Sequence, residues 1–167
     1  MLSGGSAKDI QICGNQIKLR KSVKITLDGI AKGYAVDCAI AALKRCGATA
    51  GWVNAGGDLR VYGNLVLPVH RREYNGEYTS LGGIQNAAIA TSIVTTEYDD
   101  EFPGRIMSDV ATPKIGSWSV MAHMAWRADA LTKVACLAGE SEREALIASL
   151  GGVLIKPVEA SAQGALQ

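Results

Sequence analysis

Short apolar runs separated by polar turns occur along the whole chain, and they predict a mixed α/β fold. Runs bounded by glycine, asparagine or basic residues are typical of β-strands. We expect strands at 10–12, 16–19, 23–27, 49–53, 59–62, 83–94, 117–124 and 153–155, with 65–69 extending the sheet. The polar stretch 70–77 is expected to form a loop with solvated basic residues at 70–72, and 97–115 an irregular segment.

Helical periodicity appears in two longer segments, 30–46 and 125–138. The first follows Asp28, carries Lys44 and Arg45 in its last turn and stops at Gly47, which are helix-end signals. A short third helix is expected to end at 150, after a capping box at 141–144. We expect the first helix to bury a face of small residues against the sheet, formed by Ala35, Cys38, Ala39, Ala42 and Leu43.

Composition limits the classes of function. The chain has 167 residues, 48% of them hydrophobic and 20% charged, with a net charge of +1, so a nucleic-acid or anionic-membrane partner is not expected. No run approaches the ~20 apolar residues of a membrane span, and the start lacks the apolar region of a signal peptide. The sequence does not fix the compartment. We expect one domain over 1–158 and a frayed tail over 159–167.

The cysteines argue against a zinc site. None of them is spaced as C-x-x-C, and the chain has only two histidines. Apolar helical runs surround two of the four. We therefore expect free and mostly buried thiols at Cys13, Cys38, Cys46 and Cys136.

The segment from Asp28 to Gly33 combines a carboxylate, two glycines and a lysine at a strand-to-helix junction. Lys32 lies in the first helical turn, where a cation opposes the helix dipole unless an anion joins it. Gly29 and Gly33 allow backbone to approach a ligand closely. The segment is therefore a candidate phosphate site. The alternative is an ordinary N-cap followed by a solvated lysine.

The second candidate is the link from Asn54 through Gly56 and Gly57 to Asp58, between two predicted strands. Gly-Gly between alternating strands is an ordinary hairpin signal. A hairpin alone does not explain polar groups at both ends of the link. The segment is thus either a turn or part of a ligand pocket.

Two further positions carry polar groups that suit a ligand. Asp129, in the first turn of the helix over 125–138, either stabilises the helix dipole or binds a hard cation, with Thr132 three positions later on the same face. Thr91 and Ser92 would place hydroxyls near a ligand, although a half-buried strand end explains them equally well. The candidate catalytic residues stay unassigned.

Four motifs in this order resemble the ApbE family of FAD:protein FMN transferases. That family shows Asp-x-Gly-Gly-Ile-Ala-Lys-Gly-Tyr-Ala-Val-Asp, then Asn-Ala-Gly-Gly-Asp, Ala-Thr-Ser and a helix opening Ala-Asp-Ala-Leu. The corresponding segments here are 28–37, 54–58, 90–92 and 128–131. The resemblance implies an α/β (α+β), T-fold-like domain whose mixed or antiparallel sheet packs against helices.

The resemblance also implies chemistry. Members bind FAD, use Mg²⁺ and transfer FMN through a phosphoester bond to a Thr or Ser of a target flavoprotein. Transferred residue by residue, the flavin nucleotide would lie against Asp28, Gly29, Lys32, Gly33, Asn54, Gly56, Gly57, Asp58 and Thr91. The metal would be held by the Ala31 carbonyl, Asp129 and, if the helix register allows, Thr132.

The chain departs from the family pattern in four places. It is about half as long and lacks the family's N-terminal half. The first motif is one residue shorter before Ile30, and the family's His-Ile-Ile-Asp-Pro-x-Thr-Gly loop is not recognisable, its nearest counterpart being 105–109. Lys133 stands where the family has a metal-binding Thr, so its ammonium either occupies the place of the cation or leaves that role to Thr132.

These departures leave three functions open. The chain is a short flavin transferase acting on a protein hydroxyl, a half-domain that binds a flavin nucleotide without transfer, or a structural fragment that dimerises through an exposed sheet edge. If a sheet face normally covered by the missing half is bare here, it must be buried in a partner. We therefore expect a homo-oligomer.

Overall fold

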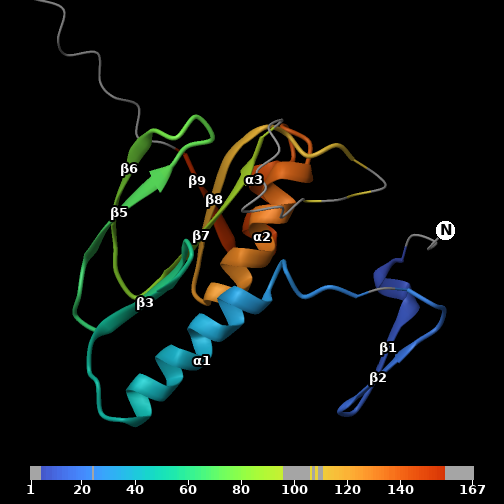
Figure 1. The fold of residues 1–167 in the computed structure, drawn as a ribbon, viewed down its shortest axis with the longest axis horizontal. Coiled ribbons are helices and arrows are strands. Elements are labelled where there is room, and N and C mark those ends of the chain that lie inside the picture. The colour runs from blue at the N-terminus through green and yellow to red at the C-terminus, as the bar shows by residue number, and fades with distance from the viewer. Residues whose placement is uncertain (1–4, 24, 96–105, 107, 109–110, 157–167) are drawn as a thin grey trace, which may run out of the picture.

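A five-stranded antiparallel sheet forms the centre of the molecule (Figure 1). The computed structural model describes residues 5–23, 25–95, 106, 108 and 111–156. The strands of the sheet lie in the order β3-β4-β7-β8-β9, and every neighbouring pair is antiparallel. Their bounds are β3 Gly51–Ala55, β4 Asp58–Tyr62, β7 Ala88–Val94, β8 Gly116–Ala122 and β9 Gly152–Ile155.

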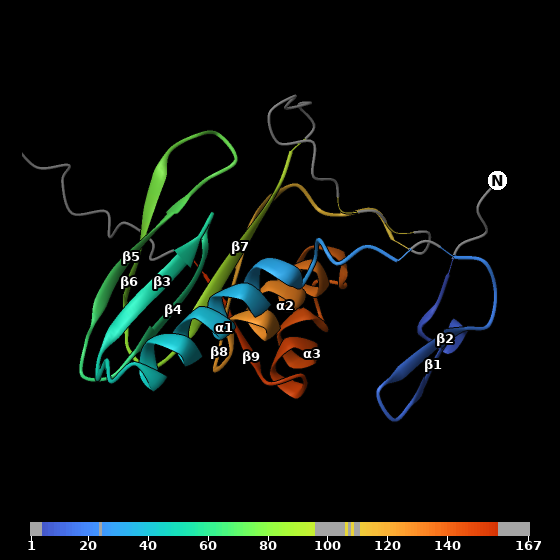
Figure 2. The same cartoon turned by 60° about the horizontal axis from the view of Figure 1, so that its bottom comes forward.

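Helices cover one face of this sheet and a two-stranded sheet covers the other (Figure 2). The helices are α1 Ala31–Arg45, α2 Ala125–Leu137 and α3 Arg143–Ser149, and the small sheet consists of β5 Leu67–Arg72 and β6 Tyr78–Ile84. Strand alternation divides the core accordingly. Ala88 and Ala90 of β7 pack toward α1 and α2, whereas Ile89 packs toward the small sheet. The predicted α/β class, with an antiparallel sheet and packed helices, is confirmed.

A short 3-10 helix, η1 Ala7–Asp9, and the hairpin of β1 Ile10–Cys13 and β2 Gln16–Leu19 precede this body. The hairpin stands apart from the three layers in both views, and all of its residues are exposed (Figures 1 and 2). No helix in the described part of the chain is long and apolar enough to cross a membrane.

Several predicted elements are wrong in detail. The described residues of 23–27 do not form a strand, and 83–94 is two strands joined by a turn at 85–87. Residues 70–72 belong to β5 rather than to a loop, and Arg71 is buried because it pairs with Glu73 at 2.8 Å and approaches Ser119. Glu142, not a capping-box serine, precedes α3. Most of 97–115 and the whole of 159–167 lie outside the described residues.

The first helix buries a different face from the predicted one. Gly33, Val36, Asp37 and Ile40 are its buried residues, whereas Ala35, Cys38 and Leu43 are exposed. The small side chains did not predict the buried face, because Gly33 and the polar Asp37 make the contact with α2. The cysteines are free, as predicted, but only one is buried, and Cys13, Cys38 and Cys46 are exposed.

Candidate functional site

Asp37 on α1 joins the two helices that frame the candidate site. Its carboxylate is 6% exposed and accepts hydrogen bonds from the backbone N–H groups of Ala125 (3.1 Å) and Trp126 (3.0 Å). It also accepts a 2.6 Å hydrogen bond from Arg60 of β4. Met124, the residue preceding α2, provides no side-chain cap. A residue from another helix therefore caps α2 and fixes its N-terminus against α1 and the sheet.

Gly33 lets the two helices touch. A Cβ built on Gly33 would overlap the carbonyl oxygen of Ala125 and would lie 2.6 Å from its carbonyl carbon and 2.7 Å from Cα of Trp126. The Gly33 N–H is left free to donate to Asp129 Oδ2 across the junction at 3.2 Å. The glycine predicted to approach a ligand thus brings α1 onto the Asp129 carboxylate.

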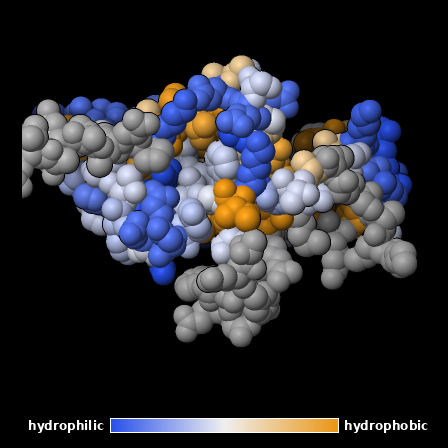
Figure 3. Space-filling model, turned by 90° about the horizontal axis from the view of Figure 1, so that it is seen from above, coloured by the Kyte–Doolittle hydropathy of each residue, from blue (hydrophilic) through white to orange (hydrophobic). Residues whose placement is uncertain are grey.

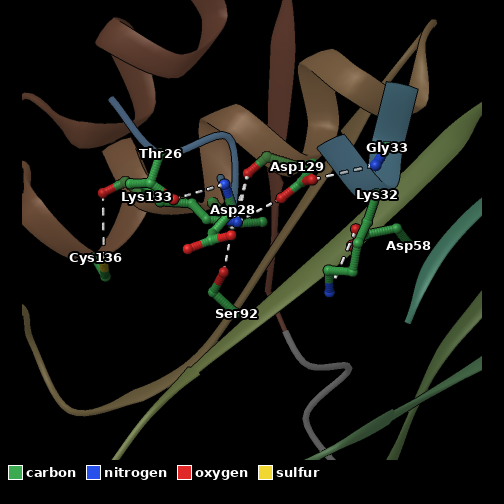
Figure 4. Close-up of polar contacts among 10 residues, drawn as sticks. Thr26, Asp28, Lys32, Gly33, Asp58, Ser92, Asp129, Lys133 and Cys136 are labelled. Carbon is green, nitrogen blue, oxygen red and sulfur yellow. Dashed lines mark hydrogen bonds and ion pairs between the residues drawn. The ribbon is translucent and has the colours of Figure 1, made fainter. Parts of the chain in front are cut away.

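Asp129 is the centre of the polar contacts in Figure 4. It is 1% exposed. Its Oδ2 accepts from Gly33, and its Oδ1 accepts from Lys133 Nζ at 2.5 Å. Lys133 Nζ also donates to the Asp129 backbone carbonyl at 3.1 Å. Both carboxylate oxygens therefore have protein donors.

Thr132 and Thr91 lie in different environments. The Thr132 hydroxyl donates to the carbonyl of Asp129 at 2.7 Å and lies 2.6 Å from Oγ of Ser92. Thr91 precedes Ser92 on β7 and points to the opposite face of the sheet. There its hydroxyl lies 2.8 Å from the Ser119 hydroxyl. Ser92, rather than Thr91, is thus the β7 hydroxyl that the structure brings to the side of the site.

The segment from Asn54 to Asp58 forms a two-residue hairpin turn between β3 and β4. Gly56 and Gly57 both have positive φ, 62° and 100°, as the tight turns that suit twisted hairpins require. Asn54 Oδ1 accepts from the Gly57 N–H at 2.9 Å and stabilises the turn. The turn itself is exposed, but Asp58, just after it, is buried.

Asp58 brings a second carboxylate close to Asp129. It is 2% exposed, and its Oδ2 lies 3.5 Å from Lys32 Nζ without a hydrogen bond. Burial raises the pKa of Asp58 to about 6, and the charge of Asp129 adds to the rise, whereas Lys32 and Lys133 oppose it. The site therefore holds two buried carboxylates and two partly exposed ammonium groups at the junction between α1, α2 and β4.

Replacing Asp58 by Asn tests this electrostatic arrangement. The folded pKa of about 6 lies above the ordinary 3.8. The folded state then binds the proton more tightly than the unfolded chain, so this group lowers stability as the pH rises from about 4 to about 6. We expect Asp58→Asn to raise the free energy of unfolding at pH 7 by about 2 kcal/mol. The difference between variant and wild type in urea unfolding should shrink toward pH 4. Parallel pH profiles would contradict this expectation.

The remaining predicted residues lie around this junction. Asp28 is exposed in the turn before α1, and its N–H donates to Thr26. Gly29 lies beside the stem of Lys133, since a Cβ there would be 3.5 Å from Lys133 Cε, an ordinary contact. Ala31 is the first residue of α1. The structure thus gathers residues of all four motifs at one place, with Ser92 rather than Thr91 contributing from the motif at 90–92.

Sequence reasoning gave no role to Asp37 or Arg60. Asp37 is the last residue of the first motif. The one sequence feature that pointed to it is that Met124, the residue before α2, has no side chain able to cap that helix, so the cap has to come from elsewhere. Arg60 is identified as the ion-pair partner of Asp37 only once the position of β4 in the sheet is known. The sequence alone therefore offered a hint for Asp37 and none for Arg60.

The described residues do not fit a divalent cation at Asp129. They contain no group of three or more His, Cys, Asp or Glu side chains arranged to hold a metal. The Lys133 ammonium lies on one Asp129 oxygen and the Gly33 N–H on the other, while the Thr132 hydroxyl is engaged with Ser92. A metal ion at Asp129 would have to displace the lysine.

Comparisons with known proteins show the family and the fold. A model of the ApbE family matches residues 4–155. Among solved structures, the fold is similar to the apo form of the flavinyl transferase ApbE from Pseudomonas stutzeri, with a TM-score of 0.66 and 19% identity, over 91% of this chain and 54% of that one. A search of curated proteins found no match.

Two further solved structures are similar. The flavin transferase ApbE from Vibrio cholerae has a TM-score of 0.62 and 21% identity, over 86% of this chain and 50% of that one. The ApbE protein from Thermotoga maritima has a TM-score of 0.69 and 25% identity, over 91% of this chain and 57% of that one. The chain thus spans about half the length of the solved proteins that it matches.

Proposed function

The chain belongs to the ApbE family, and from this premise we propose that it binds the diphosphate of FAD at the junction of α1, α2 and β4 and transfers FMN to a Thr or Ser hydroxyl of a target flavoprotein. Solved relatives described as flavin transferases support the general class of the reaction. The observation that carries the proposal is the meeting of Lys32, Asp58, Asp129 and Lys133 at one place.

The N-terminus of α1 suits a phosphate. Ile30 provides no side-chain cap, and the first turn of α1 contains no acidic residue. The positive end of the helix dipole is therefore not compensated from within the helix. Lys32 lies in that turn and is 54% exposed, so its ammonium can reach an anion outside the protein. A helix N-terminus with a lysine is a favourable phosphate site.

The proposed reaction depends mainly on position and charge. The acceptor hydroxyl oxygen forms a bond to the phosphorus of the FMN moiety and releases its proton to solvent, while the bond from that phosphorus to the bridging oxygen breaks, so AMP leaves with that oxygen. Such a transfer needs an in-line arrangement and stabilisation of negative charge on the phosphoryl oxygens. The ammonium of Lys32 would supply part of that stabilisation. The proposed transfer does not use a metal ion at Asp129, because the Asp129 oxygens already accept hydrogen bonds from Gly33 and Lys133.

The test is FMN transfer with matched lysine variants. Purified chain is incubated with FAD and a Thr-containing acceptor protein, and mass spectrometry follows the acceptor while chromatography follows AMP. Because a charge-assisted hydrogen bond contributes roughly 1.5–3 kcal/mol, Lys32→Ala should weaken FAD binding tenfold or more. Lys44→Ala, in the last turn of α1, is the control and should bind as wild type does.

The outcomes separate the two main functions. FAD binding with release of AMP and a heavier acceptor supports the transferase. FAD binding that depends on Lys32 but releases no AMP under any condition supports a flavin-nucleotide-binding half-domain. Equal binding by wild type and Lys32→Ala would contradict the proposed phosphate site.

The N-terminal hairpin favours association with a second copy. Its register pairs Ile10 with Leu19 and Ile12 with Ile17, which places four apolar side chains on one face. All four are exposed, and an isolated hairpin is marginally stable in water. Apolar residues, orange in Figure 3, lie among hydrophilic ones at the right-hand end of the molecule, where the hairpin is. We propose that this face is buried in a homo-oligomer.

Sedimentation velocity over a range of concentrations tests the association. We expect a dimer or larger species in the wild type and a shift to monomer in Ile12→Lys, since a charge on the apolar face opposes its burial. Gln11→Lys, on the other face of the same strand, is the control and should sediment as wild type does. A folded wild-type monomer at every concentration would contradict the proposal.

A further inference from the structure

The Lys133 ammonium occupies the position beside Asp129 where a bound cation would be expected. Its Nζ lies 2.5 Å from Asp129 Oδ1 and 3.1 Å from the Asp129 carbonyl oxygen. The two residues are four positions apart on α2, so the helix places them on one face. An ammonium with two oxygen partners from one residue is held firmly in place.

The charges of the junction require a cation. Asp58 and Asp129 are 2% and 1% exposed, and buried carboxylates are unfavourable unless a positive charge accompanies them. Lys32 lies 3.5 Å from Asp58 and is more than half exposed, so it provides weak compensation. Lys133, 28% exposed and in direct contact with Asp129, is the less exposed of the two ammonium groups.

The surroundings of Lys133 are shaped to keep its side chain there. Its stem passes over Gly29, where a Cβ would be in ordinary contact with Cε, Cδ and Cγ at 3.5–4.0 Å. Figure 4 shows the side chain running from α2 toward Asp129 beside the turn that holds Thr26 and Asp28. An ammonium has three N–H donors, and two of them have partners here. No partner of the third is found in the part of the chain that the structure describes, so it would be available to an anion at the mouth of the junction.

We propose that Lys133 is a tethered cation that takes the place of a divalent metal ion in this site, so that the chain binds a nucleotide diphosphate without Mg²⁺. The inference rests on the proposed function for the identity of the diphosphate. The claim that Lys133 excludes a metal from Asp129 stands on the contacts of Lys133 alone. One N–H of Lys133 would then contact a phosphate oxygen directly.

The first experiment measures metal binding without any nucleotide. Wild type, Lys133→Thr and the control Lys44→Thr are titrated with Mn²⁺, and free Mn²⁺ is followed by electron paramagnetic resonance. We expect Lys133→Thr to bind Mn²⁺ at least tenfold more tightly than wild type, because the substitution frees Asp129 Oδ1 and adds a hydroxyl. Lys44→Thr should bind as weakly as wild type. Circular dichroism confirms that each variant is folded.

Two results would overturn the inference. One is tight Mn²⁺ binding by the wild type that is lost in Asp129→Asn. This comparison does not depend on a Lys133 variant. The other is a folded Lys133→Thr that binds Mn²⁺ no better than wild type. Neither result depends on FAD, so failure of the proposed flavin function remains distinguishable.

A second experiment joins the inference to the nucleotide. FAD binding by wild type is expected to be the same in EDTA and in Mg²⁺, whereas Lys133→Thr should bind FAD at least tenfold more tightly with Mg²⁺ than with EDTA. Wild-type affinity that falls tenfold on addition of EDTA would contradict the role of Lys133 as the cation.

Discussion

Asp37→Ala is expected to lower the free energy of unfolding by about 3–5 kcal/mol, the loss associated with leaving a buried charge without its partner. The substitution removes the acceptor of the Ala125 and Trp126 N–H groups at the start of α2 and leaves Arg60, whose side chain is 11% exposed, without its 2.6 Å partner. Urea unfolding followed by circular dichroism measures the change. FAD binding should fall in parallel because α2 carries Asp129 and Lys133.

Two controls separate capping from charge. Asp37→Asn keeps an acceptor oxygen for α2 but removes the charge opposite Arg60, so we expect roughly half the loss. Asp28→Ala removes an exposed carboxylate before α1 and should change stability by less than about 0.5 kcal/mol. A loss below about 1 kcal/mol for Asp37→Ala would show that α2 does not depend on this cap.

Gly33→Ala should destabilise the chain by about 3 kcal/mol or more, the upper range for forcing extra atoms into a packed contact. Alanine is favoured over glycine in a helix by about 1 kcal/mol, so propensity alone predicts the opposite sign. The added Cβ would lie 2.6–2.7 Å from backbone atoms of Ala125 and Trp126, which cannot move without shifting α2. Thermal and urea unfolding both measure this effect.

Gly29→Ala is the matched control for Gly33→Ala. Its Cβ would meet Lys133 Cε at 3.5 Å, an ordinary contact with a flexible side chain, and Gly29 does not require positive φ. We expect a change within about 0.5 kcal/mol. Equal stabilities of the two alanine variants would contradict the close approach of α1 and α2 at Gly33.

Much of the element order was predictable because local signals were strong. The first long helix was expected over 30–46 and is found at Ala31–Arg45, since basic residues in its last turn and a following glycine mark its end. The hairpin turn at Gly56 and Gly57 was one of the two alternatives that the Gly-Gly link between alternating strands offered. Where the pattern of side chains and the turn chemistry agreed, the prediction was close.

The buried face of α1 was not predictable from residue size. Alanine, cysteine and leucine suggested one face, but the contact with α2 uses Gly33 for close approach and Asp37 as a cap. A carboxylate becomes favourable in the interior only when donors from distant residues meet it. Those donors are some 88 positions away in the sequence. A pattern confined to one helix cannot contain them.

Which of Thr91 and Ser92 lies on the side of the site likewise could not be predicted without the structure of the sheet. Adjacent strand residues point to opposite faces, and the sequence alone does not say which face carries the helices. Ala88 and Ala90 packing against α1 and α2 place Ser92 on that side. Arg71 was expected in solvent for a similar reason, because its partners Glu73 and Ser119 are brought to it only by the packing of β5 against β8.

The position of Lys133 beside Asp129 was predictable from spacing, and an ammonium in the place of the cation was one of the two alternatives that the family resemblance left open, the other being a role for Thr132. Residues four apart on a helix share a face, which leaves an exposed salt bridge and a buried cation as alternatives. The burial of Asp129 and its contact with Gly33 make Lys133 a half-buried partner of a buried carboxylate here. The proposed independence from Mg²⁺ follows from these contacts of Lys133 with Asp129.

The most direct measurement is an equilibrium titration of the wild-type chain with FAD, followed by flavin fluorescence, once in Mg²⁺ and once in EDTA. Saturable micromolar binding with the same Kd in both conditions is the predicted result, because the ammonium groups of Lys32 and Lys133 serve the diphosphate without a metal ion. No binding in either condition, or binding seen only with Mg²⁺, would contradict a lysine-based flavin nucleotide site.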